Sequence, residues 1–106
     1  MMEVKAIIRP NKLATLRSVL LEIPGFPGMT VSKVEGCSAP TKINKVTIKD
    51  ELTDYSAKVR IEIICNDDIA EILMEKIVGV CQTGLIGDGV VWSTEVSKAY
   101  FISKTS

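Results

Sequence analysis

Residues 58–80 read KVRIEIICNDDIAEILMEKIVGV, a strand pattern followed directly by a helix pattern. The first half alternates charged and apolar side chains, which is typical of a half-buried strand. Residues 66–68, Asn-Asp-Asp, then supply a helix cap and first-turn acids that suit the helix dipole. Apolar residues follow at helical spacing, at Ile69, Ile72, Leu73, Ile77 and Val80. The stretch therefore predicts a strand at 58–65 that leads into a capped helix.

The N-terminal third repeats this order. Residues 4–9 form a β-branched segment that Pro10 ends, and Asn11 can cap a helix. That helix has leucine or isoleucine at positions 13, 16, 20 and 23, and the Pro/Gly-rich stretch 24–28 ends it. Residues 29–36 then read as a second strand.

The C-terminal third completes the pattern, because residues 90–92 and 96–102 are strand-like. The whole chain, 1–106, thus predicts one α+β domain, a ferredoxin-like β-α-β-β-α-β sandwich. Two helices can cover only one face of its sheet. The other face would carry Ile7, Ile63 or their neighbours, and an exposed apolar face predicts an oligomer.

The apolar pattern dissolves between about 37 and 56. A loop near this length is uncommon inside a small domain and is usually functional or disordered. Its lysines, Lys42, Lys45 and Lys49, either meet an acidic partner or simply keep the loop soluble.

Composition excludes several classes of protein. The chain has no histidine, so it has neither a His-Ser or His-Cys catalytic arrangement nor an imidazole metal site, and we expect no bound metal. Its 13 basic and 13 acidic residues give zero net charge, which argues against a nucleic-acid binder. The zero hides an asymmetry, since residues 1–60 carry a net charge of +4 and residues 61–106 a net charge of −4. No pair of carboxylates stands out as a general acid and base.

The three cysteines, Cys37, Cys65 and Cys81, form no CxxC pair, and no signal-peptide pattern precedes them. This usage indicates a reducing cytoplasm, with Cys65 and Cys81 as small core residues. The longest apolar run is interrupted by Glu62, so we expect no membrane insertion.

Residues 83–89, TGLIGDG, are the best local candidate for a binding site. Glycines allow positive φ values and let backbone N–H groups converge on an anion. The segment lacks the Walker pattern and follows a helix instead of preceding one. From these residues alone it is either an anion cradle or a tight helix-to-strand turn, in which Asp88 is a turn former.

Several segments taken together resemble the PII nitrogen-regulatory signal proteins over essentially the whole chain. They are residues 6–10 (AIIRP), 12–13 (KL), 28–31 (GMTV), 58–63 (KVRIEI), 67–69 (DDI) and 82–89 (QTGLIGDG). The resemblance implies a homotrimer whose clefts between subunits bind an adenine nucleotide. It also implies that the long loop (the T-loop, about 37–56) docks a membrane transporter or an enzyme. On this basis we expect a regulatory protein and not an enzyme.

The resemblance also assigns roles by position. Gly87, Asp88 and Gly89 of the glycine-rich B-loop (83–89) would contact the phosphates, next to Val90. Lys58 would handle a small anionic effector at the base of the T-loop. The residues implied on the base and ribose side are Ile7, Thr30, Gly36, Cys37, Ser38 and Ile64.

Four cations of the family pattern are missing. The family has a lysine where this chain has Val90, arginines where it has Phe101 and Ser103, and an arginine near Ala39. Each charge-assisted contact is worth on the order of 1.5–3 kcal/mol, so ADP or AMP is a more plausible ligand than ATP. The T-loop glutamine and tyrosine of the family are also absent. The effector, whether 2-oxoglutarate, bicarbonate or another anion, therefore stays open, as does the process: nitrogen regulation, bicarbonate transport or metal transport.

Three alternatives remain at this point. One is a small acylphosphatase-like enzyme on the same fold, for which residues 9–11 (Arg-Pro-Asn) are the nearest phosphate loop. Another is a PII-like trimer that has lost nucleotide binding. The third is a trimeric metal-tolerance protein of similar architecture.

Overall fold

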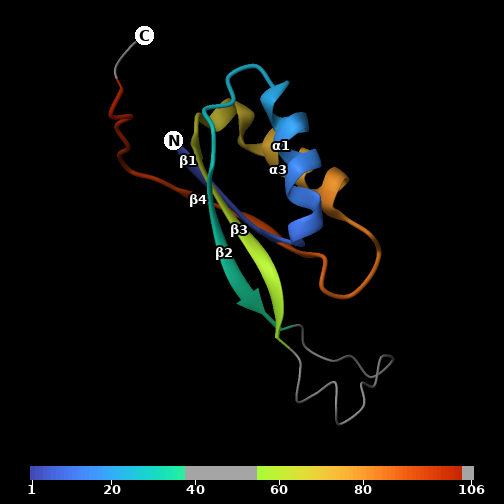
Figure 1. The fold of residues 1–106 in the computed structure, drawn as a ribbon. Coiled ribbons are helices and arrows are strands. Elements are labelled where there is room, and N and C mark those ends of the chain that lie inside the picture. The colour runs from blue at the N-terminus through green and yellow to red at the C-terminus, as the bar shows by residue number, and fades with distance from the viewer. Residues whose placement is uncertain (38–54, 104–106) are drawn as a thin grey trace.

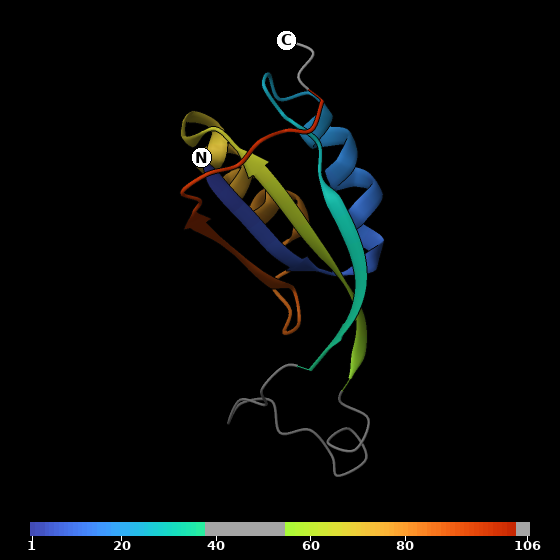
Figure 2. The ribbon, with the colours of Figure 1, turned by 90° about the vertical axis from the view of Figure 1, so that its left-hand side faces the viewer.

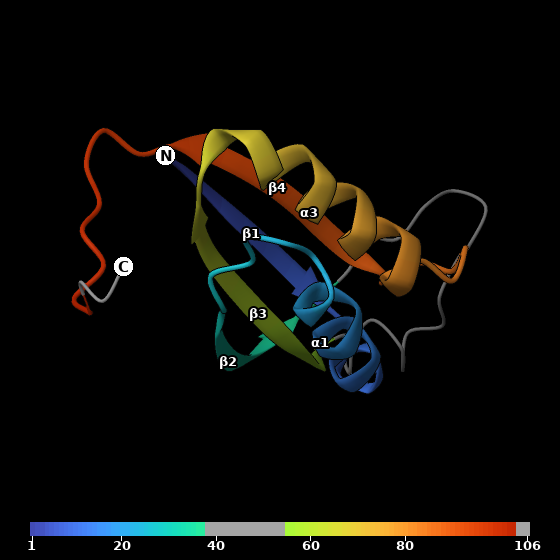
Figure 3. The same ribbon diagram turned by 90° about the horizontal axis from the view of Figure 1, so that it is seen from above.

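The structure is a computed structural model that describes residues 1–37 and 55–103. Two helices lie on one face of a four-stranded sheet (Figures 1 and 3). In chain order the elements are β1 (Met2–Ile8), the 3-10 turn η1 (Pro10–Lys12), α1 (Leu13–Leu21), β2 (Thr30–Gly36), β3 (Ser56–Cys65), α3 (Asp67–Cys81) and β4 (Gly89–Glu95).

The strand order across the sheet is β2-β3-β1-β4, and every neighbouring pair is antiparallel (Figure 2). This order, with a helix after β1 and another after β3, confirms the ferredoxin-like prediction. The β2–β3 pairing continues to Gly36 and Ser56, whereas β1 ends at Ile8 opposite Val59. The β2–β3 pair therefore extends beyond the end of β1.

The core lies between the sheet and the helices. Alternate residues of β1 and β3 point into it, and α1 and α3 each contribute residues at helical spacing. Cys65 and Cys81 are buried there as predicted. The buried apolar residues are Val4, Ala6, Ile8, Leu16, Leu20, Val59, Ile61, Ile63, Cys65, Ala70, Leu73, Ile77 and Cys81.

The helix-free face of the sheet agrees with the prediction in part, since it carries Ile7 as expected but Ile64 in place of its neighbour Ile63. Ile63 is buried on the helix side, and its neighbour Ile64 lies on the open face. Successive strand residues point to opposite faces, so Ile64 shares its face with Arg60 and Glu62. Lys5 is opposite both Glu62 and the half-buried Trp92 on this face. The open face therefore mixes charged and apolar side chains and is not a continuous apolar surface.

Two sequence-based boundaries were wrong. Asn11 lies inside the 3-10 turn, and neither it nor any other side chain caps the N-terminus of α1. Residues 96–102 form no strand, because β1 begins at Met2 and offers no partner beyond the bond from the amide of Val96 to the carbonyl of Met1. This segment instead crosses from the β4 edge toward the loop before β2 (Figure 2). Within the described part of the chain, no helix has both the length and the apolarity needed to cross a membrane.

Candidate functional site: the glycine loop and its anchors

The segment between α3 and β4 forms a glycine-rich turn next to the sheet. Gly84, Gly87 and Gly89 all have positive φ values, of 81°, 92° and 111°. Only glycine adopts such angles without strain, which explains the three glycines in this short stretch. At Gly89 the turn enters β4 opposite Ile8, so the loop is fixed to β1 at its C-terminal end.

The Asp88 carboxylate holds the two ends of this loop together. Its Oδ2 accepts hydrogen bonds from the backbone amides of Thr83, at 2.6 Å, and Gly84, at 3.0 Å. Its Oδ1 accepts from the Thr83 hydroxyl and from Nε of Arg9, the latter at 3.1 Å. The hydrogen bonds from Thr83, followed by those from Arg9 and Gly84, hold the pKa of Asp88 well below its usual range. Asp88 is therefore ionised at neutral pH.

Two cations from neighbouring strands reach the same loop. Arg9 follows β1 and donates from Nη2 to the carbonyl oxygen of Ile86, at 2.8 Å. Lys58 of β3 is 7% exposed and donates from Nζ to the carbonyl oxygen of Gly87. Burial, and secondarily the nearby Arg9, lower the pKa of Lys58. The loop thus lies against two positive charges at the point where β3 runs toward the long loop.

A hollow of about 460 Å³ opens beside this loop, within the usual range for a ligand site. Its lining combines apolar side chains, the glycine loop, the exposed Cys37 and one cation. The lining residues are Ile7, Gly36, Cys37, Lys58, Leu85, Ile86, Gly87, Asp88, Gly89 and Val90.

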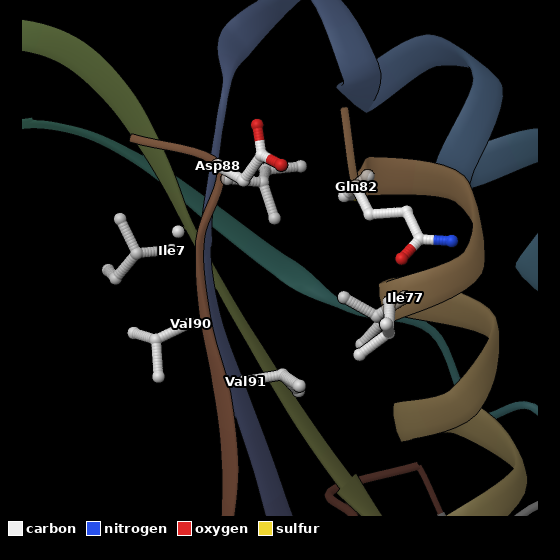
Figure 4. A pocket seen from close by; sticks show the side chains of 10 residues that line it. Ile7, Ile77, Gln82, Asp88, Val90 and Val91 are labelled. Carbon is white, nitrogen blue, oxygen red and sulfur yellow. The ribbon is translucent and has the colours of Figure 1, made fainter. Parts of the chain in front are cut away.

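A smaller apolar pocket lies on the helix side of the same loop (Figure 4). There Val91 points toward Ile77 of α3, whereas Ile7 and Val90 point to the opposite side of the sheet. Val90 is 56% exposed. Val90 thus borders both pockets, and its side chain points to the side of the open-face hollow that Lys58 also lines.

Thr30 and Ile64 line a second hollow of about 480 Å³, together with Gly28, Glu62 and Phe101. Ile64 is opposite Glu3, whereas Gly89 is opposite Ile8. At about 3.4 Å per residue, roughly 17 Å of strand separates the two levels of the sheet. The structure therefore places the expected site residues in two hollows near opposite ends of one subunit.

Comparison with known proteins decides the family. The family model described as "Nitrogen regulatory protein P-II" matches residues 1–106. The chain belongs to this family. It is 36% identical over 99 residues to nitrogen regulatory protein P-II 1 of Escherichia coli K12, which covers 92% of this chain and 88% of the relative. It is 38% identical over 99 residues to nitrogen regulatory protein P-II 2 of Methanothermobacter thermautotrophicus, which covers 92% of this chain and 85% of the relative.

The structure gathers most of the site residues that the P-II resemblance implied into one hollow, and it leaves Thr30 and Ile64 in the other. Ser38, Lys42, Lys45 and Lys49 lie outside the described residues. The residues gathered in one hollow are Ile7, Gly36, Cys37, Lys58, Gly87, Asp88, Gly89 and Val90.

Sequence reasoning missed Arg9 and Thr83 as anchors of the P-II glycine loop. Arg9 is 79 residues from Asp88, and no local pattern predicts their contact. The available signal was an arginine between a strand and Pro10, which places its side chain at the end of β1. Both of these guanidinium contacts go to the glycine loop, so Arg9 supports that loop.

The pKa of Lys58 leads to a test. Since this pKa lies below 10.5, Lys58 loses its charge as the pH rises toward that value. We expect the affinity of the wild type for a phosphate-bearing ligand to fall in this range, while Lys58→Met binds about tenfold more weakly at pH 7 and shows a flatter profile. Titration calorimetry between pH 7 and 10 measures both.

The free energy of unfolding of the wild type, compared with Lys58→Met, should rise with pH, whereas its affinity for the ligand falls. A lysine whose pKa is lowered on folding carries its burial cost at low pH, and this cost decreases as the pH rises from the folded pKa toward the unfolded value of 10.5. The wild type should therefore gain stability relative to Lys58→Met toward pH 10. Burial is the largest cause of the lowered pKa of Lys58; of its ionisable neighbours, Arg9 lowers this pKa further and Asp88 raises it. Parallel profiles for the two proteins would contradict the assignment.

Proposed function

We propose that this P-II protein is a homotrimeric regulator that binds an adenine nucleotide, ADP or AMP in preference to ATP, in clefts between subunits. In this proposal the nucleotide state is passed to a membrane transporter or an enzyme through residues 37–56. The observation that carries the proposal is the glycine loop, which is ordered against Arg9 and Lys58 with three glycines in conformations that suit close backbone approach to an anion.

The division of the site over two hollows supports its location between subunits. One subunit presents the glycine loop and Lys58, and about 17 Å away it presents Thr30 and Ile64. A single nucleotide that contacts both sets would do so most simply by bridging two copies. The mixed open face, with its ion pairs between Lys5 and Glu3 and between Arg60 and Glu62, offers charged and apolar groups for such a contact.

The charges around the glycine loop support a nucleotide with few phosphates. Among the residues that the structure describes, Lys58 is the cation that lines the hollow, and Arg9 is already paired with Asp88. Position 90 is a valine, and position 101, in the second hollow, is a phenylalanine. A triphosphate in this cleft would leave charge without a partner.

The target is proposed only as a class. Lys42, Lys45 and Lys49 suit an acidic surface on a transporter or enzyme, and the process is nitrogen regulation or a related transport function. Cys37, Cys65 and Cys81 are free, in agreement with a cytoplasmic location.

Titration calorimetry with ATP, ADP and AMP tests the nucleotide part. We expect ADP or AMP to bind at least tenfold more tightly than ATP, with up to one nucleotide per subunit. Repeating the titrations with 2-oxoglutarate and with bicarbonate identifies the effector class. Absence of binding below millimolar concentration for all three nucleotides would contradict the nucleotide proposal.

Sedimentation of the same sample tests the assembly. A particle about three times the 11.6 kDa of one chain is expected. A monomer would remove the argument that two subunits share the site.

A further inference from the structure

The Asp88 carboxylate has no acceptor capacity left for a ligand. An ionised carboxylate offers about four lone-pair sites. Two are used on Oδ1, by Arg9 and the Thr83 hydroxyl, and two on Oδ2, by the amides of Thr83 and Gly84. The Thr83 hydroxyl also accepts from the amide of Leu85, at 3.2 Å. Asp88 therefore binds the first residues of its own loop, although its side chain borders the hollow.

Arg9 ties this loop to the sheet. Its guanidinium contacts the Asp88 carboxylate and the Ile86 carbonyl, so one side chain from the end of β1 holds the middle and the end of the loop. The Arg9 and Asp88 side chains are 29% and 22% exposed, so water screens the pair only in part. Hydrogen bonds between ionised partners are about twice as strong as those between neutral ones.

These contacts all lie within the chain, and together they restrict the backbone of the loop. A loop already held in its bound conformation avoids the entropic cost of ordering when a ligand binds. We propose that Asp88, Arg9 and Thr83 are positioning residues that hold the glycine loop in the shape that receives an anion, without themselves touching it. The proposal rests on the proposed function and adds to it: the ligand's phosphate is received by the backbone of the loop, not by the side chain of Asp88.

Asp88→Asn tests this directly. The asparagine side chain has the same size but carries an NH₂ donor in place of one acceptor oxygen. This NH₂ group would face the N–H and O–H groups that donate to Asp88 in the wild type. We expect the affinity for ADP to fall at least tenfold, and the affinity for adenosine, which has no phosphate, to change less than twofold. Asp68→Asn, the same change at an exposed acid in the first turn of α3, is the matched control and should leave both affinities unchanged. Titration calorimetry gives all values.

A matched pair at Thr83 provides the same test without altering a charge. Thr83→Ser retains the hydroxyl and should bind ADP like the wild type, whereas Thr83→Val loses the hydroxyl and should bind more weakly. If Asp88→Asn does not fold, Thr83→Ser and Thr83→Val still test whether the anchor of the loop affects the affinity for ADP. Equal loss of ADP and adenosine affinity, or no loss in either Asp88→Asn or Thr83→Val, would overturn the proposal.

A ligand-free measurement separates this inference from the nucleotide proposal. In the wild type the amides of Thr83 and Gly84 are bonded to Asp88 and should exchange slowly with solvent. In Asp88→Asn we expect their hydrogen exchange to be at least tenfold faster, with the core amides of β1 and β3 unchanged. If the wild type binds no nucleotide, the proposed function fails, while this comparison still tests the anchor. Unchanged exchange at Thr83 and Gly84 would overturn the anchor itself.

Discussion

Gly89→Ala is expected to lower the free energy of unfolding by on the order of 3–5 kcal/mol, from the combined costs of backbone strain and overpacking. A domain of this size has a total stability of about 5–15 kcal/mol. Gly89 has a φ of +111°, which side-chain-bearing residues rarely adopt, and an added Cβ would fall well inside 3.0 Å of the carbonyl oxygen of Ile7. The atoms that the Cβ would meet belong to the backbone carbonyl group of Ile7, so a change of side-chain rotamer cannot relieve the clash. Urea denaturation followed by the fluorescence of the single tryptophan measures the loss.

Two other glycines separate the close approach from ordinary glycine effects. Gly84 also has a positive φ, of +81°, but open space at its Cβ position, so Gly84→Ala should cost only about 1–2 kcal/mol. Gly79 lies within α3, also with open space, and Gly79→Ala should stabilise the protein by about 0.5–1 kcal/mol. If Gly89→Ala lowers the free energy of unfolding no more than Gly84→Ala does, the close approach of Gly89 to β1 is not what requires a glycine at this position.

The fold was predictable where the hydrophobic pattern of a segment matches the neighbouring element that it packs against or pairs with. The alternation in 58–65 and the helical spacing in 69–80 each define a buried face, and β3 and α3 form there. On the open face the prediction of Ile7, Ile63 or their neighbours was confirmed for Ile7 and for Ile64, the neighbour of Ile63, whereas Ile63 itself is buried under the helices. Arg60 and Glu62, which alternate with the buried residues, share that face with Ile64, so it is not purely apolar. The prediction was wrong at 96–102, since β propensity says nothing about whether a neighbouring strand exists to pair with.

The candidate site was predictable only in its local part. Three glycines within six residues marked the loop, because positive φ values leave a trace in the sequence. The anchors leave no such trace. Arg9 and Lys58 reach the loop across 77 and 29 residues, through strand pairing that no single segment encodes. The residues alone allowed Asp88 to be a turn former, and its four hydrogen bonds to the loop and to Arg9 agree with that interpretation. Contact between Asp88 and a phosphate was implied only by the family resemblance and stays a prediction.

Val90→Lys is expected to raise the affinity for ATP by about 10- to 100-fold, because a charge-assisted contact is worth on the order of 1.5–3 kcal/mol. Val90 directly follows the glycine loop and points, with Ile7, to the side of the sheet where Lys58 lines the hollow (Figure 4). The lysine would join Lys58, the cation that the described part of the chain supplies to this hollow. Since Val90 is 56% exposed, the fold should change in stability by less than about 0.5 kcal/mol. Calorimetric titration of both proteins with ATP, ADP and AMP measures the change.

The gain in affinity of Val90→Lys for each of the three nucleotides shows whether charge selects the ligand. If charge selects the ligand, the gain should rise from AMP through ADP to ATP and shrink at high salt, because salt screens an exposed charge. Val90→Gln supplies a long polar side chain without the charge and should reproduce little of the gain. An equal gain for all three nucleotides, or an equal gain in Val90→Gln, would mean that side-chain length and contact area set the affinity. The preference for fewer phosphates would then have to come from the second hollow, where Phe101 lies beside Thr30 and Ile64.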